Sequence, residues 1–379
     1  MDNKFTLRRG TYDEYDQYMD FINFVFAPDN KTYFQDLLPK LYKRELNSAH
    51  DAFIAFDGDK MVGAVGAFPS EIKVLDKTIK CMGIGNVAAH PEYRSQGIMS
   101  SLMNMAIDDM VANGIDFSFL GGQRQRYGYF SYDIAGICIS FYITGSNIRH
   151  TYGKTPIKYE LTREALDPND TEALDGIYNI INARPYVHVR SRELLYDIMH
   201  TWHQAPTIIR HNGKFVGYAI GDGEIGFIDD DYFESYIRTM LSVTNEYSIT
   251  LPIYETKYIS LLQPIASGYT VSSNLLATVL CFKRVTEACL AFKATYTKLV
   301  DGSFTALVHG RGGDEKFTIS VCNNKVSVEY TDAEPDIELN HHDAMSFFCA
   351  CESCQRYNGP AVADQWFPLP LSVFHVDEV

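Results

Sequence analysis

The stretch "NVAAHPEYRSQGIMSSLMNMAI", residues 86–107, runs from a β-like segment through a proline and a single glycine into a helical pattern. From Ile98 onward, apolar side chains recur at the spacing that places them on one face of a helix. A strand that ends at Ala89 and a helix that begins near Ile98 leave the N–H groups of residues 95–100 without intrahelical partners. The stretch therefore predicts a positively polarised nest of amides between a strand and a helix.

Two residues in this junction suit an anionic ligand. Gly97 lets the backbone approach a ligand without a Cβ atom in the way, and Arg94 adds a mobile cation. A pyrophosphate group is the ligand that such a helix start favours. The junction is neither a Walker loop, which needs Gly-Lys-Ser/Thr, nor the triple-glycine turn of a Rossmann fold. Because Arg-x-x-Gly alone more often marks a structural turn, the interpretation depends on the surrounding elements.

The surrounding sequence predicts the elements that such a junction requires. A capping box that starts at Thr11 predicts a first helix, and residues 33–44 suggest a second. Residues 51–68 are typical of two strands around a tight turn, and a further strand leads into the junction. The junction helix meets a stop signal at Gly114, and residues 116–122 follow as a buried strand. This strand, helix, strand unit should place its two strands in parallel.

A second copy of the pattern follows along the chain. "IIRHNGKFVGYAIG" (208–221) matches "IAFDGDKMVGAVG" (54–66) in its tight turn and in the Lys-apolar-Val-Gly segment after it. We therefore expect a diverged duplication. Where the first copy has its glycine-bearing turn, the second has three aspartates at 229–231, which suit a helix start but repel phosphate. The second copy is expected to lack a pyrophosphate site.

The last part of the chain has a different pattern of apolar and polar residues. Beyond residue 282 the sequence alternates as strands do, with a turn at Asn323-Asn324, and "DIELNHHDAMSFFCACE" then looks helical. This predicts a third, α+β unit. The chain ends in "QWFPLPLSVFHVDEV", which is too apolar to extend into solvent and is expected to dock on the protein.

Composition restricts the class of protein. The 379 residues suffice for two or three domains, and 46% hydrophobic residues argue against disorder. The formal charge of −15 disfavours nucleic acid and favours cationic partners. No segment is typical of a signal peptide or a membrane span, and the eight cysteines are scattered. We therefore expect a cytoplasmic protein with reduced thiols that binds neither nucleic acid nor membrane.

Two motifs resemble the signatures of the GNAT N-acetyltransferases, and more closely those of the Eis-like branch. The Arg/Gln-x-x-Gly-x-Gly/Ala signature stands as "RSQGIM" (94–99) after "VAAHP" (87–91), with Met99 in place of the final small residue. Eis-like proteins also place a large apolar residue there. The Tyr-Gly-x-Phe-Gly-Tyr signature stands as "YGYFSY" (127–132), with Ser131 in place of its second glycine.

The resemblance implies a mixed α/β (α+β) fold of tandem GNAT domains with a further domain. These would be an N-terminal GNAT acetyltransferase domain (1–147), a degenerate GNAT-like domain (148–282) and a C-terminal α+β domain similar to sterol carrier protein 2 (283–379). It implies an N-acetyltransferase with acetyl-CoA as co-substrate and direct transfer to an amine. The acceptor would be a small molecule or peptide of aminoglycoside, polyamine or lysine type. Eis-like proteins are homo-oligomers, often hexamers, and the same is expected here.

The resemblance also assigns roles to residues. Tyr127 matches the tyrosine that acts as general acid, and the terminal carboxylate of Val379 matches the general base. Backbone groups of residues 87–89 would pair with the pantetheine arm, and residues 95–100 would bind pyrophosphate. In full, the cofactor positions carried over are Val87, Ala88, Ala89, Arg94, Ser95, Gln96, Gly97, Ile98, Met99, Ser100, Gly122 and Gln123.

A zinc site is one alternative to weigh. The cluster "HHDAMSFFCACESC" offers His341, His342, Cys349, Cys351 and Cys354. On a helix only Cys351 and Cys354 share a face, so four tetrahedral ligands do not converge. Small buried thiols are the preferred interpretation, and no metal is expected.

The alternative function is a non-catalytic acyl-CoA or lipid-binding protein with a vestigial GNAT fold. Such a protein would not need Arg94, Gly97 and Tyr127 together, and this chain has all three. The second copy, with its aspartates, illustrates what loss of the site looks like. The hypothesis of a catalytic acetyltransferase is therefore preferred.

Overall fold

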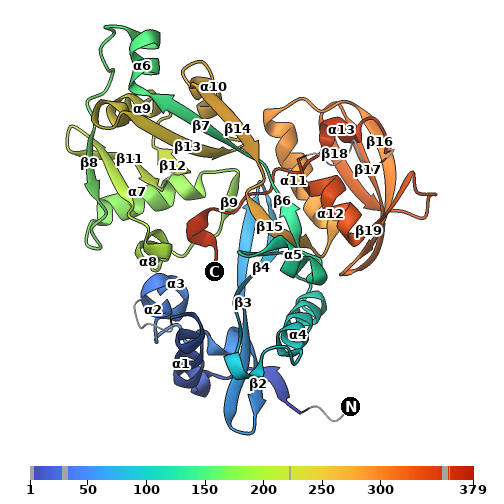
Figure 1. The fold of residues 1–379 in the computed structure, drawn as a ribbon. Helices are drawn as coiled ribbons and strands as arrows, with labels where there is room; N and C mark the ends of the chain where they lie inside the picture. The colour runs from blue at the N-terminus through green and yellow to red at the C-terminus, as the bar shows by residue number, and fades with distance from the viewer. Residues whose placement is uncertain (1–3, 28–32, 222, 352–356, 358) are drawn as a thin grey trace.

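The computed structural model describes residues 4–27, 33–221, 223–351, 357 and 359–379. They form three lobes, and the C-terminus lies between them (Figure 1). The N-terminal lobe is at the bottom of Figure 1, the central lobe at the upper left and the C-terminal lobe at the right. Each lobe combines sheet and helices, so the predicted mixed α/β class is confirmed.

One sheet forms the framework of the N-terminal lobe, in the order β1-β2-β3-β4-β5-β15-β6, with β9 paired to β3. Its strands are β1 (Thr6–Arg9), β2 (Ala52–Asp57), β3 (Lys60–Val74), β4 (Lys77–Ala89), β5 (Phe117–Leu120), β6 (Asp133–Ala135), β9 (Tyr186–His188) and β15 (Leu275–Val279). Its helices are α1 (Tyr15–Phe26), α2 (Phe34–Leu37), α3 (Pro39–Tyr42), α4 (Ile98–Ala112) and α5 (Arg124–Tyr127). β4 and β5 are parallel and α4 connects them, which confirms the predicted strand, helix, strand unit.

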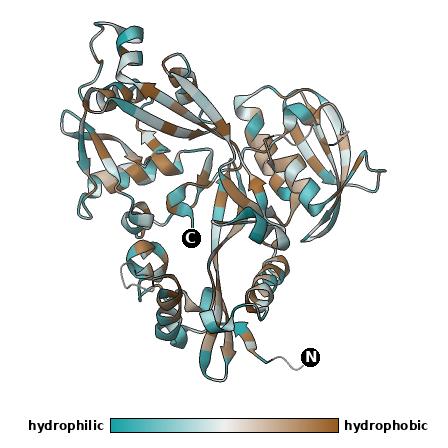
Figure 2. Cartoon of the chain, viewed as in Figure 1, coloured by the Kyte–Doolittle hydropathy of each residue, from teal (hydrophilic) through white to brown (hydrophobic). Residues whose placement is uncertain are grey.

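Successive side chains along each strand point to opposite faces of the sheet, so this lobe has a hydrophobic core on each face. Phe53 and Ala55 of β2 are buried with α4, whereas Ile54 and Phe56 are buried with α1. Figure 2 shows apolar residues on the strands between these two helices. The capping box at Thr11 is present before α1. Packing of α4 on this sheet places the start of α4 near the end of β4.

The central lobe contains two sheets, ordered β12-β11-β10-β8 and β13-β7-β14. Its strands are β7 (Cys138–Thr144), β8 (Thr162–Ala165), β10 (Thr207–His211), β11 (Lys214–Ile220), β12 (Glu224–Phe227), β13 (Glu246–Pro252) and β14 (Gly268–Ser272). Its helices are α6 (Gly145–Tyr152), α7 (Thr171–Asn182), α8 (Leu195–Met199), α9 (Tyr232–Val243) and α10 (Thr256–Leu262).

The C-terminal lobe contains a sheet ordered β18-β17-β16-β19 and, among its described residues, three α-helices. Its elements are α11 (Phe282–Tyr296), β16 (Gly302–Gly310), β17 (Gly313–Cys322), β18 (Lys325–Tyr330), β19 (Ile337–Asn340), α12 (His341–Cys349) and α13 (Ala363–Trp366). The predicted turn at Asn323-Asn324 joins β17 to β18 with both residues at positive φ. The apolar tail is buried at Leu369, Leu371 and Val376, so it docks as expected.

Backbone detail supports the internal duplication. The β2–β3 and β10–β11 hairpins both shift register at the valine of the repeated segment, Val62 in the first copy and Val216 in the second. The two copies also exchange strands. β15 lies between β5 and β6 of the N-terminal sheet, and β7 lies between β13 and β14 of the central one. Because β7 and β15 each belong to the sheet of the other copy, the domain boundaries at 147/148 and 282/283 stay a proposal.

Two predicted helices differ from the structure. Residues 33–44 form α2 and α3 rather than one helix, because Pro39 disfavours helical backbone at Leu38, which has φ −128° and ψ 62°. The segment from Ile337 begins as β19, which pairs in parallel with β16, and the helix starts only at His341. The Asn340 side chain accepts the Asp343 amide at 3.0 Å and so sets that start.

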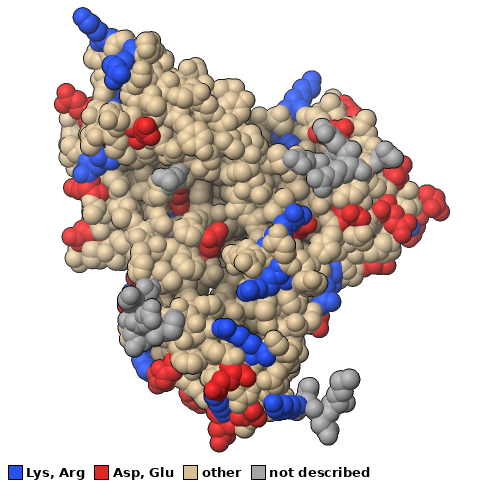
Figure 3. Space-filling model, in the orientation of Figure 1, with Lys and Arg blue, Asp and Glu red and all other residues tan. Residues whose placement is uncertain are grey.

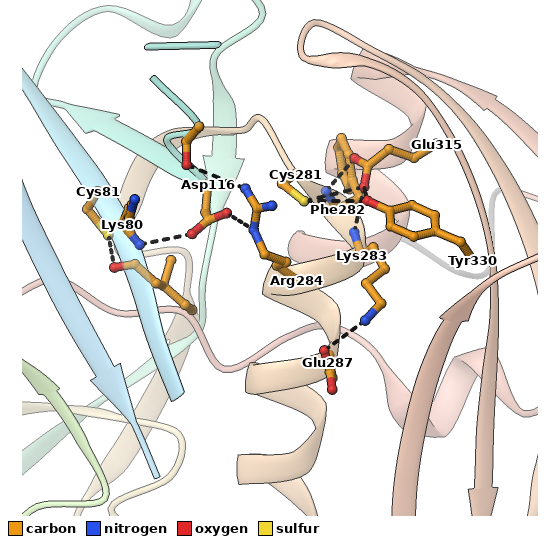
Figure 4. A network of polar contacts seen from close by, with 12 residues as sticks. Lys80, Cys81, Asp116, Cys281, Phe282, Lys283, Arg284, Glu287, Glu315 and Tyr330 are labelled. Carbon is orange, nitrogen blue, oxygen red and sulfur yellow. Dashed lines mark hydrogen bonds and ion pairs between the residues drawn. The ribbon is translucent and has the colours of Figure 1, made fainter. Parts of the chain in front are cut away.

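A polar network joins the C-terminal lobe to the N-terminal sheet (Figure 4). Asp116, next to β5, accepts the Lys80 amide at 3.0 Å and pairs with Arg284 of α11. Glu315 of β17 accepts the Phe282 amide at 2.6 Å, which caps the start of α11. The network fixes α11 against both sheets. In the part of the chain that the structure describes, no helix has the length and hydropathy to cross a membrane.

Candidate active site

The candidate site begins where β4 and β5 part. Their parallel pairing joins Cys81–Ile84 to Phe117–Leu120 and then stops. The chain leaves β5 for α5, so among described residues the end of β4, residues 85–89, has no strand partner on that side. Free backbone N–H and C=O groups of this kind can pair with an extended, amide-bearing ligand.

A bulge at Asn86 accompanies this separation. Asn86 has φ 50°, and the β3–β4 register shifts between Ala64 and Gly66. Asparagine tolerates this left-handed backbone better than most residues. Its buried side chain donates to Tyr42 Oη at 2.5 Å, which holds the bulge against the face that packs on α1.

The predicted nest is present between β4 and α4. Ser95 and Gly97 have φ of 62° and 81°. The first α4 amide with a backbone acceptor is that of Ser101, which donates to the Gly97 carbonyl at 3.0 Å. The amides of Ile98 and Met99 are therefore left for a ligand or solvent.

A cavity of about 620 Å³ lies over the nest and the end of β4. This volume is within the range of small-molecule sites. Of the predicted cofactor positions, all line it except Gln96, Gly122 and Gln123. The complete lining is Val25, Phe26, Val87, Ala88, Ala89, Tyr93, Arg94, Ser95, Gly97, Ile98, Met99, Ser100 and Arg126.

The cavity is cationic although the protein is acidic. Arg94 and Arg126 are exposed, and among described residues no carboxylate lies within ion-pair distance of either. Figure 3 shows Lys and Arg side chains gathered over α4 and α5 on this face. Two guanidinium groups without a carboxylate partner among the described residues, beside free amides, suit a phosphate-bearing ligand despite the net charge of −15.

Tyr127 lies at the end of α5 and is 7% exposed. Its ring rests on Gly122, where an added Cβ would lie 2.3 Å from Tyr127 Cε2. Gly122 is therefore required for the position of this ring. Burial raises the pKa of Tyr127 above its usual value, while Arg126 opposes that rise. The phenol accordingly keeps its proton at neutral pH.

The chain terminus lies on the same strand. An ideal Cβ at Gly85 would be 3.0 Å from the carboxyl carbon of Val379, and one at Gly83 would be 2.6 Å from a Val379 methyl carbon. These two glycines face the same side of β4 and leave room for the terminus. The terminal carboxylate is thus brought to the point where β4 separates from β5.

A buried ion cluster holds the tail in this position. Arg190 binds Asp377 through Nε at 2.8 Å and Nη2 at 2.7 Å, and binds Glu224 through Nη1 at 2.7 Å and Nη2 at 2.8 Å. Tyr218 Oη donates to Glu224 at 2.8 Å. Burial, the largest single effect, would raise the pKa of Asp377, but the charge and hydrogen bonds of Arg190, together with further nearby groups, lower it to about 2. The central lobe therefore positions the terminus.

Further groups surround the tail. Lys40 Nζ donates to the Val376 carbonyl at 2.6 Å, and burial lowers the pKa of Lys40 to about 7. Burial also lowers the pKa of His188 to about 4, so this imidazole is neutral. A cavity of about 180 Å³ opens beside Val379, lined in part by Lys40, His188, Phe68 and Phe119.

Sequence reasoning missed several of these residues. Gly83 and Gly85 carried a usable signal, because glycine inside a strand often marks a close approach of another group. Arg190, Lys40 and His188 gave none, because only the tertiary structure brings them to the terminus.

Of the residues considered for zinc, His341 and Cys349 are buried, whereas Cys351 is exposed, unlike the small buried thiols that were expected. His341 Nδ1 accepts the Arg311 amide at 2.9 Å, and Nε2 lies 3.1 Å from the Ser131 carbonyl oxygen. Burial lowers the pKa of His341 to about 4, so it is neutral. Cys349 is buried, whereas Cys354 lies outside the described residues.

Comparison with known proteins identifies the first lobe. Residues 6–135 match the family model of the acetyltransferase (GNAT) domain. No curated protein matches the sequence significantly.

Solved structures extend the likeness to the whole chain. A probable N-acyltransferase of unknown function from Enterococcus faecalis V583 is 15% identical, with 97% of this chain and 98% of that chain covered and a TM-score of 0.67. Eis1 from Mycobacterium abscessus is 14% identical, with 99% and 100% covered and a TM-score of 0.67. A GCN5-related N-acetyltransferase from Anabaena variabilis is 14% identical, with 97% and 98% covered and a TM-score of 0.63. The Eis-like architecture fits the entire chain.

Proposed function

Residues 6–135 are an acetyltransferase domain of the GNAT family, and from this premise we propose that the protein is an acetyl-CoA-dependent N-acetyltransferase that transfers the acetyl group directly to an amine. One observation carries the proposal. A cationic nest, a buried protonated tyrosine and the chain's terminal carboxylate all adjoin the stretch where β4 and β5 separate.

Acetyl-CoA would supply the activated acetyl group as a thioester. Backbone groups of residues 87–89 would pair with its pantetheine arm, since this edge of β4 has no strand partner among the described residues. The amides of residues 95–100, with Arg94 and Arg126, would hold the pyrophosphate. Gly122 would act indirectly through the ring of Tyr127.

Two groups of the chain would handle the protons. The terminal carboxylate of Val379 would accept a proton from the amine as its nitrogen bonds to the acetyl carbon. The carbon–sulfur bond breaks in the same transfer, and the Tyr127 hydroxyl would give its proton to the departing sulfur. The raised pKa of Tyr127 supports this role, because the phenol is available as an acid at neutral pH.

Thiol release from acetyl-CoA tests the function. The protein should release free thiol with at least one member of a panel of polyamines, aminoglycosides, lysine peptides and small monoamines. The alternative, a non-catalytic acyl-CoA or lipid-binding protein, predicts binding of acetyl-CoA without amine-dependent thiol release. Binding alone across the whole panel would favour that alternative.

Tyr127→Phe is expected to lower kcat by roughly 10²-fold, the lower range for loss of a general acid. The affinity for acetyl-CoA should be nearly unchanged, because the ring that rests on Gly122 is retained. Tyr129→Phe is the matched control, since Tyr129 lies in the same motif and is 89% exposed. Steady-state kinetics of both variants decide the role. Equal kcat values for Tyr127→Phe and wild type would remove Tyr127 from the mechanism.

Gly97→Leu is expected to weaken coenzyme A binding at least tenfold, because a side chain would project from the nest at φ 81°. Gly114→Leu is the matched control. Gly114 lies at the other end of α4, also at positive φ (67°), and an added Cβ meets no atom within 4 Å at either glycine. Both variants therefore carry similar backbone strain. Calorimetric titration with coenzyme A should separate them, and equal affinities would contradict the pyrophosphate site.

Further properties belong to the same proposal. The cavity of about 180 Å³ beside Val379 would receive the acceptor, for which aminoglycoside-, polyamine- and lysine-like amines stay candidates. The C-terminal lobe would be the domain similar to sterol carrier protein 2, and the protein would act as a homo-oligomer. We also propose a cytoplasmic location, in which the thiols of the chain would stay reduced.

A further inference from the structure

A third cavity lies away from the candidate active site, between the central and C-terminal lobes. Its volume is about 480 Å³, and its walls come from the end of α7, β12, the start of α10 and the end of α11. Interfaces between domains are common positions for small-molecule sites of this size. In the duplicated pattern, β12 and the turn at Asp230 correspond to β4 and the nest of the first copy. The cavity thus occupies the position of the lost pyrophosphate site.

One wall of this cavity is a row of aromatic rings. The ring centroids of Tyr186 and Tyr254 are 5.2 Å apart, those of Tyr254 and Phe292 are 5.2 Å apart, and those of Phe292 and Tyr296 are 5.4 Å apart. Ring faces attract cations, and the rings offer an apolar surface as well. The wall suits a ligand that is both cationic and apolar.

Two polar groups at the cavity have no hydrogen-bond partner in the part of the chain that the structure describes. No described residue forms a hydrogen bond or ion pair with the Glu255 carboxylate, and burial raises its pKa. Tyr296 Oη is buried without a hydrogen-bond partner among the described residues. Glu255 is half-buried, whereas the Tyr296 hydroxyl is shielded from solvent, and a shielded polar group without a partner is costly and therefore uncommon in folded proteins. A ligand that donates hydrogen bonds would satisfy both.

The other charged groups at the cavity already have partners. Asp230 binds Lys257 Nζ at 2.6 Å and Tyr258 Oη at 2.9 Å. The Lys257 side chain is 79% exposed, so solvent screens its charge. Arg184 donates to the Ile225 carbonyl at 2.5 Å. The charge of Arg184 also lowers the pKa of the Glu255 carboxyl, against the effect of burial. Among the described residues, Glu255 is nevertheless the carboxylate at this cavity without a hydrogen bond or ion pair, and it is therefore the acceptor open to a ligand.

We infer that this cavity binds an organic ammonium ion, with its N–H groups on Glu255 and Tyr296 and its apolar body against the aromatic wall. The first copy of the duplicated unit presents free amides and arginines to an anion, whereas the second presents carboxylates and aromatic rings to a cation. This binding site is separate from the proposed acetyl transfer and does not depend on it.

Calorimetric titration with benzylammonium chloride, without acetyl-CoA, tests the site. The wild-type protein should bind benzylammonium, and Glu255→Gln should weaken that binding at least tenfold, as expected for loss of a hydrogen bond to a charged group. Benzyl alcohol, the neutral analogue, should bind at least tenfold more weakly than benzylammonium to the wild type and equally to both proteins. Unchanged benzylammonium affinity in Glu255→Gln, or no saturable binding to the wild type, would overturn the inference.

Controls separate this site from the active site and from misfolding. Glu193→Gln, which alters an exposed carboxylate of the same lobe, should leave benzylammonium binding unchanged. The melting temperature of Glu255→Gln should equal or exceed that of the wild type, because a half-buried carboxylate that desolvation disfavours is removed. Thiol release with acetyl-CoA should be the same in Glu255→Gln and wild type. The activity assay therefore tests the proposed acetyl transfer separately from the benzylammonium titration.

Discussion

Arg190→Met is expected to destabilise the protein by about 3–5 kcal/mol, the usual cost of breaking a buried ion pair by removing one partner. The side chains of Arg190, Glu224 and Asp377 are each 3% exposed. Methionine would leave both carboxylates without their cation in a region that water does not reach. Denaturation with urea, monitored by fluorescence, measures the loss in free energy of unfolding.

Arg192→Met is the matched control for this experiment. Arg192 is two positions along the same segment and pairs with Asp175 at 2.7 Å, but the two side chains are 29% and 65% exposed. Exposed pairs contribute at most about 1 kcal/mol, so this variant should stay close to the wild type. Similar losses in both variants would show that the buried cluster has no special part in holding the tail.

Removal of Asp377–Val379 is expected to lower kcat by roughly 10³-fold, within the range for loss of a general base. The deletion moves the terminal carboxylate to Val376 and away from Gly85, next to which it lies in the intact chain. Coenzyme A affinity should be retained, because these residues do not line the cavity over the nest. Arg190 would keep Glu224 as a partner, which limits the loss of stability.

Val379→Ala distinguishes the carboxylate from the side chain. This variant keeps the terminal charge and removes only the methyl groups that adjoin Gly83. Its kcat should remain within a few fold of wild type. A shortened chain that turns over at the wild-type rate would exclude the terminal carboxylate as base. In the shortened chain Arg190→Met should lower kcat no further, because Arg190 acts on the terminus through Asp377.

Local patterns predicted much of the fold. The helical spacing from Ile98, the parallel strands on either side of that helix and the glycine at the junction are all present. These features depend on backbone conformation and on periodicity, which a short stretch of sequence specifies. The break at Pro39 could have been predicted as well, since proline disfavours helical backbone in the residue before it.

Other features depended on contacts between distant segments. Ile337–Asn340 is a strand because β16 lies beside it, and β7 and β15 each belong to a sheet of the other copy. Such pairings depend on which sheet edges have no strand partner in the folded chain. A local sequence pattern does not contain this information. The helix predicted over residues 337–340 was therefore wrong, although the unit around it was predicted correctly.

The sequence by itself determined the nest: a strand, a glycine that can adopt positive φ and an amphipathic helix leave amides unpaired wherever the chain folds. Only the tertiary structure decided where in the molecule the last residue lies. The terminus reaches β4 because Arg190, from a segment 187 residues before Asp377, holds the tail by a buried ion pair. Loss of the cation is costly because its partner carboxylates are buried, and burial is a property of the packed molecule rather than of any stretch within it.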